Sequence, residues 1–219
     1  MPATREIKWV VLVLLALAAG LSGAWALWGG VSETEAARLM ELLQLRPGMT
    51  AGEVGAGVGD MTVLLARRLG PNGRVFSNEL ESDNLQKIRR AVDKAGLSNV
   101  TVLQGEEKSA KLPAACCAAI VMRKVYHHVV DPAAMNSSLA EALRPGGRLA
   151  VIDFSPSRWR FWLRRPDGVS EDRGGHGVPP EILVREMTAA GLELEKRLDD
   201  WPGRNYCAVF RKRDLARPY

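Results

Sequence analysis

The feature that most constrains this chain is a glycine-rich turn, Glu53-Val54-Gly55-Ala56-Gly57-Val58-Gly59-Asp60. Glycines at alternate positions let the backbone pass close to a bound ligand, where a Cβ atom would collide. Residues 50–54 are typical of a β-strand, and residues 61–69 have helical apolar spacing that ends at Gly70-Pro71-Asn72-Gly73. Hairpins and plain loops also produce glycine-rich turns, but a strand, turn and helix in this order predict a site for a nucleotide-like cofactor.

The rest of the chain alternates apolar strands with amphipathic helices, which is typical of a parallel sheet covered on both faces. Start signals mark three of the helices: a capping box of Ser32 and Glu35, the pair Asp131-Pro132, and the pair Pro179-Pro180. Residues 192–198 and 206–211 are separated by a turn signal and predict a closing hairpin. We therefore expect one α/β domain over residues 31–219, preceded by a separate hydrophobic segment over residues 1–30.

The glycine turn departs from the dinucleotide-binding pattern GxGxxG, and the departure points away from NAD. An acidic residue followed by GxGxG resembles motif I of the class I S-adenosylmethionine-dependent methyltransferases. Further segments are similar to later strands of that family, in family order: 73–79, 100–106, 118–123 and, with its Leu-x-Pro-Gly-Gly turn, 143–153. The resemblance implies a Rossmann-like three-layer α/β/α fold with a mostly parallel seven-stranded sheet whose last strand is antiparallel.

The resemblance also implies that S-adenosylmethionine is the cofactor, bound beyond the carboxyl ends of the strands. Glu79 matches the acid that accepts hydrogen bonds from the cofactor ribose, and Glu106 would lie beside the adenine. Carboxylates suit a sulfonium cation that also carries an amino group. Glu53 could instead only brace the loop, and Asp60 could only cap the next helix. The cofactor-binding residues predicted in this way are Glu53, Gly55, Ala56, Gly57, Gly59, Asp60, Glu79, Leu80, Gly105 and Glu106.

The best catalytic candidates follow the fourth predicted strand, at Tyr126, His127 and His128. Methyl transfer is an in-line displacement that needs a base only if the acceptor must lose a proton, and imidazole titrates in the right range. Adjacent histidines are also often simple polar packing. We expect no metal site here, because adjacent side chains should point apart and no ligand-spaced partner is evident.

The acceptor side is predicted to include an insertion between Asp153 and Pro179, where Trp159 and His176 are candidate substrate-binding residues. Arginines and aromatic residues alternate over residues 158–165, which suits an anionic headgroup, a nucleic acid base or a membrane interface. A helix with an apolar face and solvated arginines would give the same pattern.

These residues favour a membrane-associated methyltransferase that acts on a small molecule or lipid-like compound. Protein or nucleic acid methylation is the alternative, less favoured because Val125-Tyr126-His127-His128 replaces the Asn-Pro-Pro-Tyr signature of many base and amide methylases. We therefore expect no nucleic acid partner. A non-catalytic or nicotinamide-binding Rossmann-fold protein is the alternative from another class. Oligomeric state cannot be read from the sequence.

The chain contains three cysteines, at positions 116, 117 and 207. Disulfides between neighbouring residues are strained and rare. We therefore expect all three to be small buried apolar residues.

Residues 9–28 are uncharged and mostly apolar, long enough to cross a bilayer, with tryptophans at both ends. We expect a retained anchor, with a cleaved signal peptide as the alternative because Ala24-Trp25-Ala26 has a small-x-small ending. Arg5 and Lys8 precede the segment, which favours an exported domain, although S-adenosylmethionine is made in the cytosol. The net charge of +5 supports contact with an anionic membrane only weakly.

Overall fold

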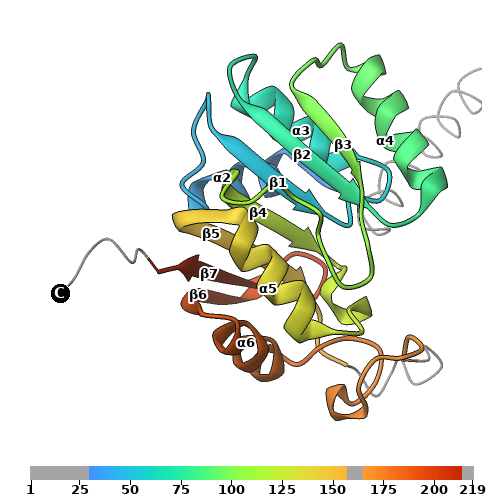
Figure 1. Ribbon diagram of the computed structural model, residues 1–219, viewed down its shortest axis with the longest axis vertical. Helices are drawn as coiled ribbons and strands as arrows, with labels where there is room; N and C mark the ends of the chain where they lie inside the picture. Colours follow the sequence, from blue (N-terminus) through green and yellow to red (C-terminus); the bar gives the residue numbers. More distant parts are fainter. Residues whose placement is uncertain (1–29, 157–164, 214–219) are drawn as a thin grey trace, which may run out of the picture. The chain divides into compact units, whose positions relative to one another are not determined.

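The computed structural model describes residues 30–156 and 165–213, and its centre is a seven-stranded sheet (Figure 1). The strand order is β3-β2-β1-β4-β5-β7-β6. Strands β1 to β5 pair in parallel, and β7 runs antiparallel to both β5 and β6. The expected Rossmann-like fold with an antiparallel last strand is confirmed. The strands are β1 (Thr50–Val54), β2 (Arg74–Glu79), β3 (Val100–Gln104), β4 (Cys117–Arg123), β5 (Leu143–Asp153), β6 (Leu192–Trp201) and β7 (Asn205–Lys212).

Helices cover both faces of this sheet (Figure 1). Helices α2, α3 and α4 pack side by side on one face, and α5 packs against α6 on the other. Asp131 caps α5 as expected, since its carboxylate accepts a hydrogen bond from the Ala134 N–H at 3.1 Å. The elements are α2 (Glu33–Leu42), α3 (Asp60–Leu69), α4 (Ser82–Lys94), α5 (Pro132–Ala142) and α6 (Pro180–Ala189), with short 3₁₀ helices η1 (Tyr126–His128) and η3 (Glu171–Arg173).

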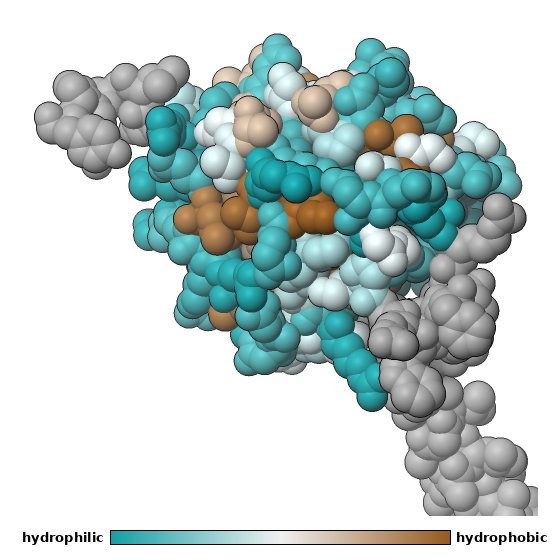
Figure 2. Space-filling view, turned by 90° about the horizontal axis from the view of Figure 1, so that it is seen from below, coloured by the Kyte–Doolittle hydropathy of each residue, from teal (hydrophilic) through white to brown (hydrophobic). Residues whose placement is uncertain are grey.

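The core is centred on β4, which is buried at every position from Cys117 to Met122. Burial on both faces is what a central parallel strand under two helical layers requires. The largest cluster joins Ile120 of β4 to Leu139 of α5, Leu183 of α6 and Phe210 of β7. Seen from below, the surface is mainly hydrophilic, with a hydrophobic strip near the centre and a smaller hydrophobic patch apart from it (Figure 2).

The cysteines differ from the expectation. Cys116 and Cys117 form a disulfide, whereas Cys207 is a buried free thiol in β7, as expected. The expectation rested on the rarity of such pairs, but neighbouring residues are already close, here with Cα atoms 3.7 Å apart. Cys117 begins β4, at the end of the strand opposite to Arg123.

The predicted membrane segment, residues 9–28, lies outside the described residues. Within residues 30–156 and 165–213, none of the helices combines the length and apolar character needed to cross a bilayer.

A buried ion pair ties α2 to the carboxyl end of β4. The guanidinium of Arg123 donates from Nε to Glu35 Oε1 at 2.9 Å and from Nη2 to Oε2 at 3.1 Å. The indole Nε1 of Trp201, at the end of β6, also donates to Glu35 Oε1 at 2.9 Å. The sequence places Glu35 in a helix-capping motif and gives no sign of these two distant partners.

We predict that Glu35→Ala destabilises the fold by about 3 kcal/mol or more, because Arg123 loses a buried, bidentate partner. Glu33→Ala is the matched control, since it removes the exposed ion pair with Arg68 and should cost less than about 1 kcal/mol. Urea unfolding of both variants measures the difference. Equal losses would show that the Glu35 pair contributes no more than a surface pair.

Glu53, the acidic residue before the glycine turn, is 3% exposed and lies within β1. Its carboxylate accepts a hydrogen bond from the Thr62 hydroxyl of α3, and that hydroxyl lies 2.8 Å from the Ser77 hydroxyl of β2. Burial raises the pKa of Glu53 to about 8, although the Thr62 hydrogen bond opposes the rise. The folded protein therefore holds this carboxyl protonated at neutral pH.

We predict that Glu53 makes stability fall as pH rises from about 5 to 8. Its folded pKa lies above its unfolded value of 4.5, so only the unfolded state ionises in this window. The stabilisation is complete below the unfolded pKa and is lost at about 1.4 kcal/mol per pH unit until the pH passes the folded pKa. Glu53→Gln keeps an acceptor for Thr62 and should flatten the dependence.

Urea unfolding of wild type and Glu53→Gln at pH 5, 6, 7 and 8 checks this. Glu41→Gln, which removes an exposed acid of α2, is the control and should run parallel to wild type. If the stability of Glu53→Gln changed with pH in parallel with wild type, the folded protein would not hold Glu53 uncharged.

Candidate active site

A cavity of about 380 Å³ opens at the carboxyl ends of β1, β2 and β4. Its volume lies within the usual range for small-molecule sites. The sheet order reverses between β1 and β4, because β2 and β3 lie on one side of β1 and β5 lies beyond β4. Open α/β sheets bind ligands at such reversal points.

One wall of the cavity is acidic. It contains Glu79 at the end of β2, Glu81 just before α4, and Glu106 and Glu107 after β3. The sequence motifs predict Glu79 and Glu106 but not Glu81 and Glu107, which follow the ends of the same strands. The wall suits a ligand with positive charge and hydroxyl groups.

Glu79 is fixed by backbone donors. Its Oε2 accepts a hydrogen bond from the Gly57 N–H at 2.6 Å, and its Oε1 accepts one from the Leu80 N–H at 2.7 Å. Each carboxylate oxygen has two lone-pair sites, so Oε2 keeps capacity for a hydroxyl donor. The glycine turn and the ribose-binding candidate thus form one unit, although they lie on different strands.

Gly55 is required for a reason that the sequence did not show. Its φ of 73° is left-handed, and a Cβ there would lie 2.3 Å from Val125 Cγ2. Val125 follows β4 and lines the cavity beside Gly55. The missing side chain therefore makes room for a protein wall, and not only for a ligand.

The predicted cofactor residues divide into two groups. Gly55, Glu79, Leu80, Gly105 and Glu106 line the cavity. The others support its walls: Gly57 binds Glu79, Gly59 caps α3 with a φ of 91°, and Glu53 binds Thr62. Ala56 is buried in the turn, and Asp60 is the exposed first residue of α3.

The opposite wall is apolar, with Val125, Val129, Val130 and Met135, and it also includes His128. Val129 and Val130 come from the segment between η1 and α5, and Met135 comes from the first turns of α5. The sequence does not single out these four residues, because apolar side chains after a strand carry no pattern that separates a cavity wall from core.

All three histidines of the chain meet beside this wall. The ring centroid of His127 lies 4.1 Å from that of His128 and 4.8 Å from that of His176. The expectation that adjacent histidines point apart is wrong here, and the partner that the sequence did not reveal is His176, from the segment before α6. Both premises for expecting no metal site, side chains that point apart and the lack of a third ligand, are therefore contradicted.

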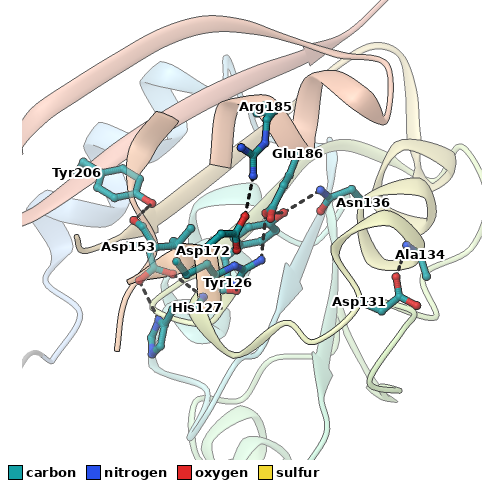
Figure 3. A network of polar contacts seen from close by, with 12 residues as sticks. Tyr126, His127, Asp131, Ala134, Asn136, Asp153, Asp172, Arg185, Glu186 and Tyr206 are labelled. Carbon is teal, nitrogen blue, oxygen red and sulfur yellow. Dashed lines mark hydrogen bonds and ion pairs between the residues drawn. The ribbon is translucent and has the colours of Figure 1, made fainter. Parts of the chain in front are cut away.

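Asp153, at the end of β5, orients His127. The Asp153 carboxylate accepts hydrogen bonds from His127 Nδ1 at 2.8 Å and from the His127 backbone N–H at 3.0 Å (Figure 3). Both side chains are almost fully buried. Because a carboxylate can only accept, Nδ1 is the donor in this contact, and Nε2 is the ring nitrogen that Asp153 does not engage.

His128 is the histidine that reaches the cavity. Desolvation lowers its pKa to about 4, with help from the neighbouring rings of His127 and His176. The ring is therefore neutral at physiological pH and can accept a proton or a metal ion.

Tyr126 does not have the catalytic position that the sequence suggested. It is fully buried, and its hydroxyl donates to Glu186 Oε2 and accepts from Asn136 Nδ2, both at 2.8 Å (Figure 3). Burial and the nearby Glu186 carboxylate raise the pKa of this phenol far above its usual range. Tyr126 is not part of the cavity lining and its hydroxyl is bonded to α5 and α6, so its role is structural. Trp159 lies outside the described residues.

The residues present fit S-adenosylmethionine. The acidic wall complements its sulfonium and amino groups, and Glu79 Oε2 can accept from a ribose hydroxyl. The apolar wall can cover the uncharged parts of the molecule. His128 borders the same cavity, on the side where an acceptor can approach.

A family model described as a methyltransferase domain matches residues 45–173. A ubiquinone/menaquinone biosynthesis C-methyltransferase of Teredinibacter turnerae is 30% identical over 129 residues, which cover 58% of this chain and 51% of that protein. A protein-L-isoaspartate O-methyltransferase of Pyrococcus horikoshii is 30% identical over 151 residues, 68% of this chain and 65% of that protein. The chain thus spans about half to two thirds of these relatives.

Solved structures agree on the fold. An S-adenosylmethionine-dependent methyltransferase from Aquifex aeolicus has a TM-score of 0.68 at 21% identity, covering 81% of this chain and 89% of that one. Geranyl diphosphate C-methyltransferase from Streptomyces coelicolor has a TM-score of 0.67 at 15% identity, covering 82% of this chain and 80% of that one. With the family match over more than half of the chain, these findings establish that the chain belongs to the methyltransferase-domain family.

Proposed function

We propose that this methyltransferase acts on a small or lipid-like acceptor that approaches the methyl donor from the histidine side of the cavity. The observation that carries the proposal is the position of His128, which lines the donor cavity and also contacts His127 and His176. His128 therefore connects the donor site to the cluster of three histidines, which has no part in binding the donor.

The division of the cavity supports the proposal. Its carboxylates gather at the ends of β2 and β3, where they can accept hydrogen bonds from the donor's hydroxyl groups. Its opposite wall is formed by valines and a methionine, and Val130 is 42% exposed. Such a wall can hold apolar parts of an acceptor without an energetic penalty for burying polar groups.

The protein's chemical contribution is then positioning and proton handling. Bound S-adenosylmethionine supplies an electrophilic methyl group. The cavity holds the acceptor at near-attack distance, and the neutral imidazole of His128 is placed to take a proton from an acceptor that must lose one.

Two relatives point to different acceptor classes. The Teredinibacter turnerae relative is named for quinone biosynthesis, which favours a small or lipid-like acceptor. The Pyrococcus horikoshii relative is named for protein isoaspartate, so methylation of a protein carboxylate is a second candidate. A peptide acceptor would need a groove at the cavity mouth, whereas a lipid-like acceptor needs only the apolar wall.

We also propose that residues 9–28 tether the enzyme to a membrane. The support is their uncharged, mostly apolar sequence with flanking tryptophans. A tether would concentrate the domain near lipid-like acceptors. Removal of the segment as a signal peptide is the alternative.

We predict that His128→Ala abolishes most turnover while S-adenosylmethionine affinity stays within about threefold, since His128 borders the donor site without supplying its carboxylates.

Glu79→Ala should weaken cofactor binding by about 10-fold or more, about 1.4 kcal/mol at least, because a ribose acceptor and the Gly57 contact are lost. Calorimetric titration with the cofactor measures the affinity of each variant. Product screening of extracts from cells with and without the gene measures turnover.

Glu41→Gln serves as the neutral control in these assays, because this residue of α2 is exposed and lies outside the cavity lining. Absence of cofactor binding by the wild-type protein would refute the donor assignment. Methylated products found only among peptides would replace the small-acceptor proposal with the second candidate.

For the anchor, we predict that the full-length protein sediments with membranes, stays there in high salt and is released by detergent. High salt removes proteins held only by surface charge, but not a spanning helix. Cell fractionation followed by mass analysis of the intact protein tests this. A soluble protein whose mass corresponds to a start near Leu27 would show a cleaved signal peptide instead.

A further inference from the structure

We propose that His127, His128 and His176 form a binding site for a divalent transition-metal ion, most suitably Zn²⁺, at the edge of the methyl-donor cavity. Each histidine offers one ring nitrogen, and these nitrogens all lie within 4.8 Å of one another. The chain has three histidines in total, so every imidazole of the protein is in this cluster. The metal-binding proposal itself does not depend on the acceptor class.

The spacing fits a metal after small side-chain adjustments. Zinc–nitrogen bonds of about 2.0–2.1 Å in a tetrahedral site place ligand nitrogens about 3.3 Å apart. The rings need to close by at most about 1.5 Å, which rotation about their χ angles can supply.

His127 already has the outer-shell partner of a metal ligand. Its Nδ1 donates to the buried Asp153 carboxylate at 2.8 Å, which leaves Nε2 as the atom that can bind a cation. A carboxylate behind a metal-bound histidine fixes the ring and raises its basicity. The negative charge of Asp153 also offsets part of the charge of a divalent ion.

The backbone holds His176 in place beside this pair. Gly177 has a φ of 129°, and a Cβ there would lie 2.7 Å from the carbonyl oxygen of Phe154. The next residue, Val178, donates its N–H to the same Phe154 oxygen at 3.0 Å. The segment therefore lies directly against the end of β5, one residue beyond Asp153.

A second contact fixes the segment from its other side. Arg173 is fully buried and donates from Nη1 to the Tyr126 carbonyl oxygen and from Nη2 to Glu186, each at 3.0 Å. This residue joins η3, just before His176, to η1, which carries the histidine pair. Both halves of the cluster are therefore positioned before any ion binds.

The donor set selects the class of metal. Imidazole nitrogens bind Zn²⁺, Co²⁺, Ni²⁺ and Cu²⁺ well, whereas Mg²⁺ and Ca²⁺ prefer oxygen. Three protein ligands leave a fourth tetrahedral position open, as in catalytic zinc sites. Because His128 lines the donor cavity, this open position lies next to the space for the acceptor.

Such an ion would give the proposed function a specific acceptor class, namely a thiol or hydroxyl compound. Its S–H or O–H proton is lost to solvent when the sulfur or oxygen binds the metal. The acceptor lone pair then forms the bond to the methyl carbon while the carbon–sulfur bond of the donor breaks, and that electron pair stays on the donor sulfur. This acceptor role rests on the proposed function.

The test uses full-length protein, treated with a chelator and titrated with Co²⁺ alone and then with Zn²⁺ against a chromophoric zinc chelator. No reducing agent is added, so that Cys116 and Cys117 remain paired. We expect about one ion per chain, visible d–d absorption typical of four or five ligands, and displacement of Co²⁺ by Zn²⁺. His128→Ala and His176→Ala should each weaken affinity by about 100-fold or more, beyond the roughly 10–100-fold loss typical of outer-shell changes.

Two further variants test whether the ion binds at the histidine cluster and not at the acidic wall of the cavity. Gly177→Ala keeps all three imidazoles but displaces the segment at Phe154, and should also weaken binding. Glu107→Gln removes a carboxylate of the acidic wall and should leave metal affinity unchanged. Circular dichroism and unfolding curves confirm that each variant is folded.

Absence of ion binding, or equal affinity in wild type and the two histidine variants, would overturn the proposal. The outcome is independent of the donor site, because cofactor binding is titrated separately. If the cofactor binds and the metal does not, the metal site is refuted while the donor assignment stands. Turnover that a chelator removes and Zn²⁺ restores would establish the acceptor role.

Discussion

The histidine side of the cavity depends on one buried cation, Arg173. Burying a guanidinium is costly unless its charge is paired and its donors are used. Arg173 meets this condition through the Glu186 carboxylate and the Tyr126 carbonyl oxygen. The two bonds lock α6 and η3, which both follow β5, against η1, which follows β4. The position of the histidines is therefore set by an interaction that contains no histidine.

The two walls of the site differ in how they are built. The donor side uses backbone N–H groups of the glycine turn and of the residue after β2 to hold the Glu79 carboxylate, so it is organised by local chain geometry. The histidine side uses side chains from β5, η1 and the segment before α6, so it is organised by tertiary packing. This difference explains how a common donor site can serve many acceptors: the loops after β4 and β5 can change while the glycine turn stays the same.

The same difference explains what the sequence could predict. Contiguous residues encode the strands, the helix starts and the donor side. The fold and half of the cavity's acidic residues could therefore be predicted from the sequence. The meeting of His176 with His127 is a contact between distant segments, without local periodicity. Tyr126 was wrongly placed because the direction of a side chain in a short 3₁₀ helix depends on how the helix docks. The partners of Glu35 were unpredictable for the same reason, since Arg123 and Trp201 belong to other layers of the fold.

Asp153 connects the fold to the chemistry. Its fully buried carboxylate receives N–H donors from the His127 ring, the His127 backbone and the Phe154 backbone, so its charge is compensated without a cation. Because these donors define the end of β5 and the start of η1, the carboxylate cannot move without disturbing both. The orientation of the His127 ring is therefore a consequence of the fold, and it is fixed beside the other two histidines before any ligand arrives. Preorganisation of this kind lowers the cost of binding a proton or an ion, since the ring does not have to be reoriented.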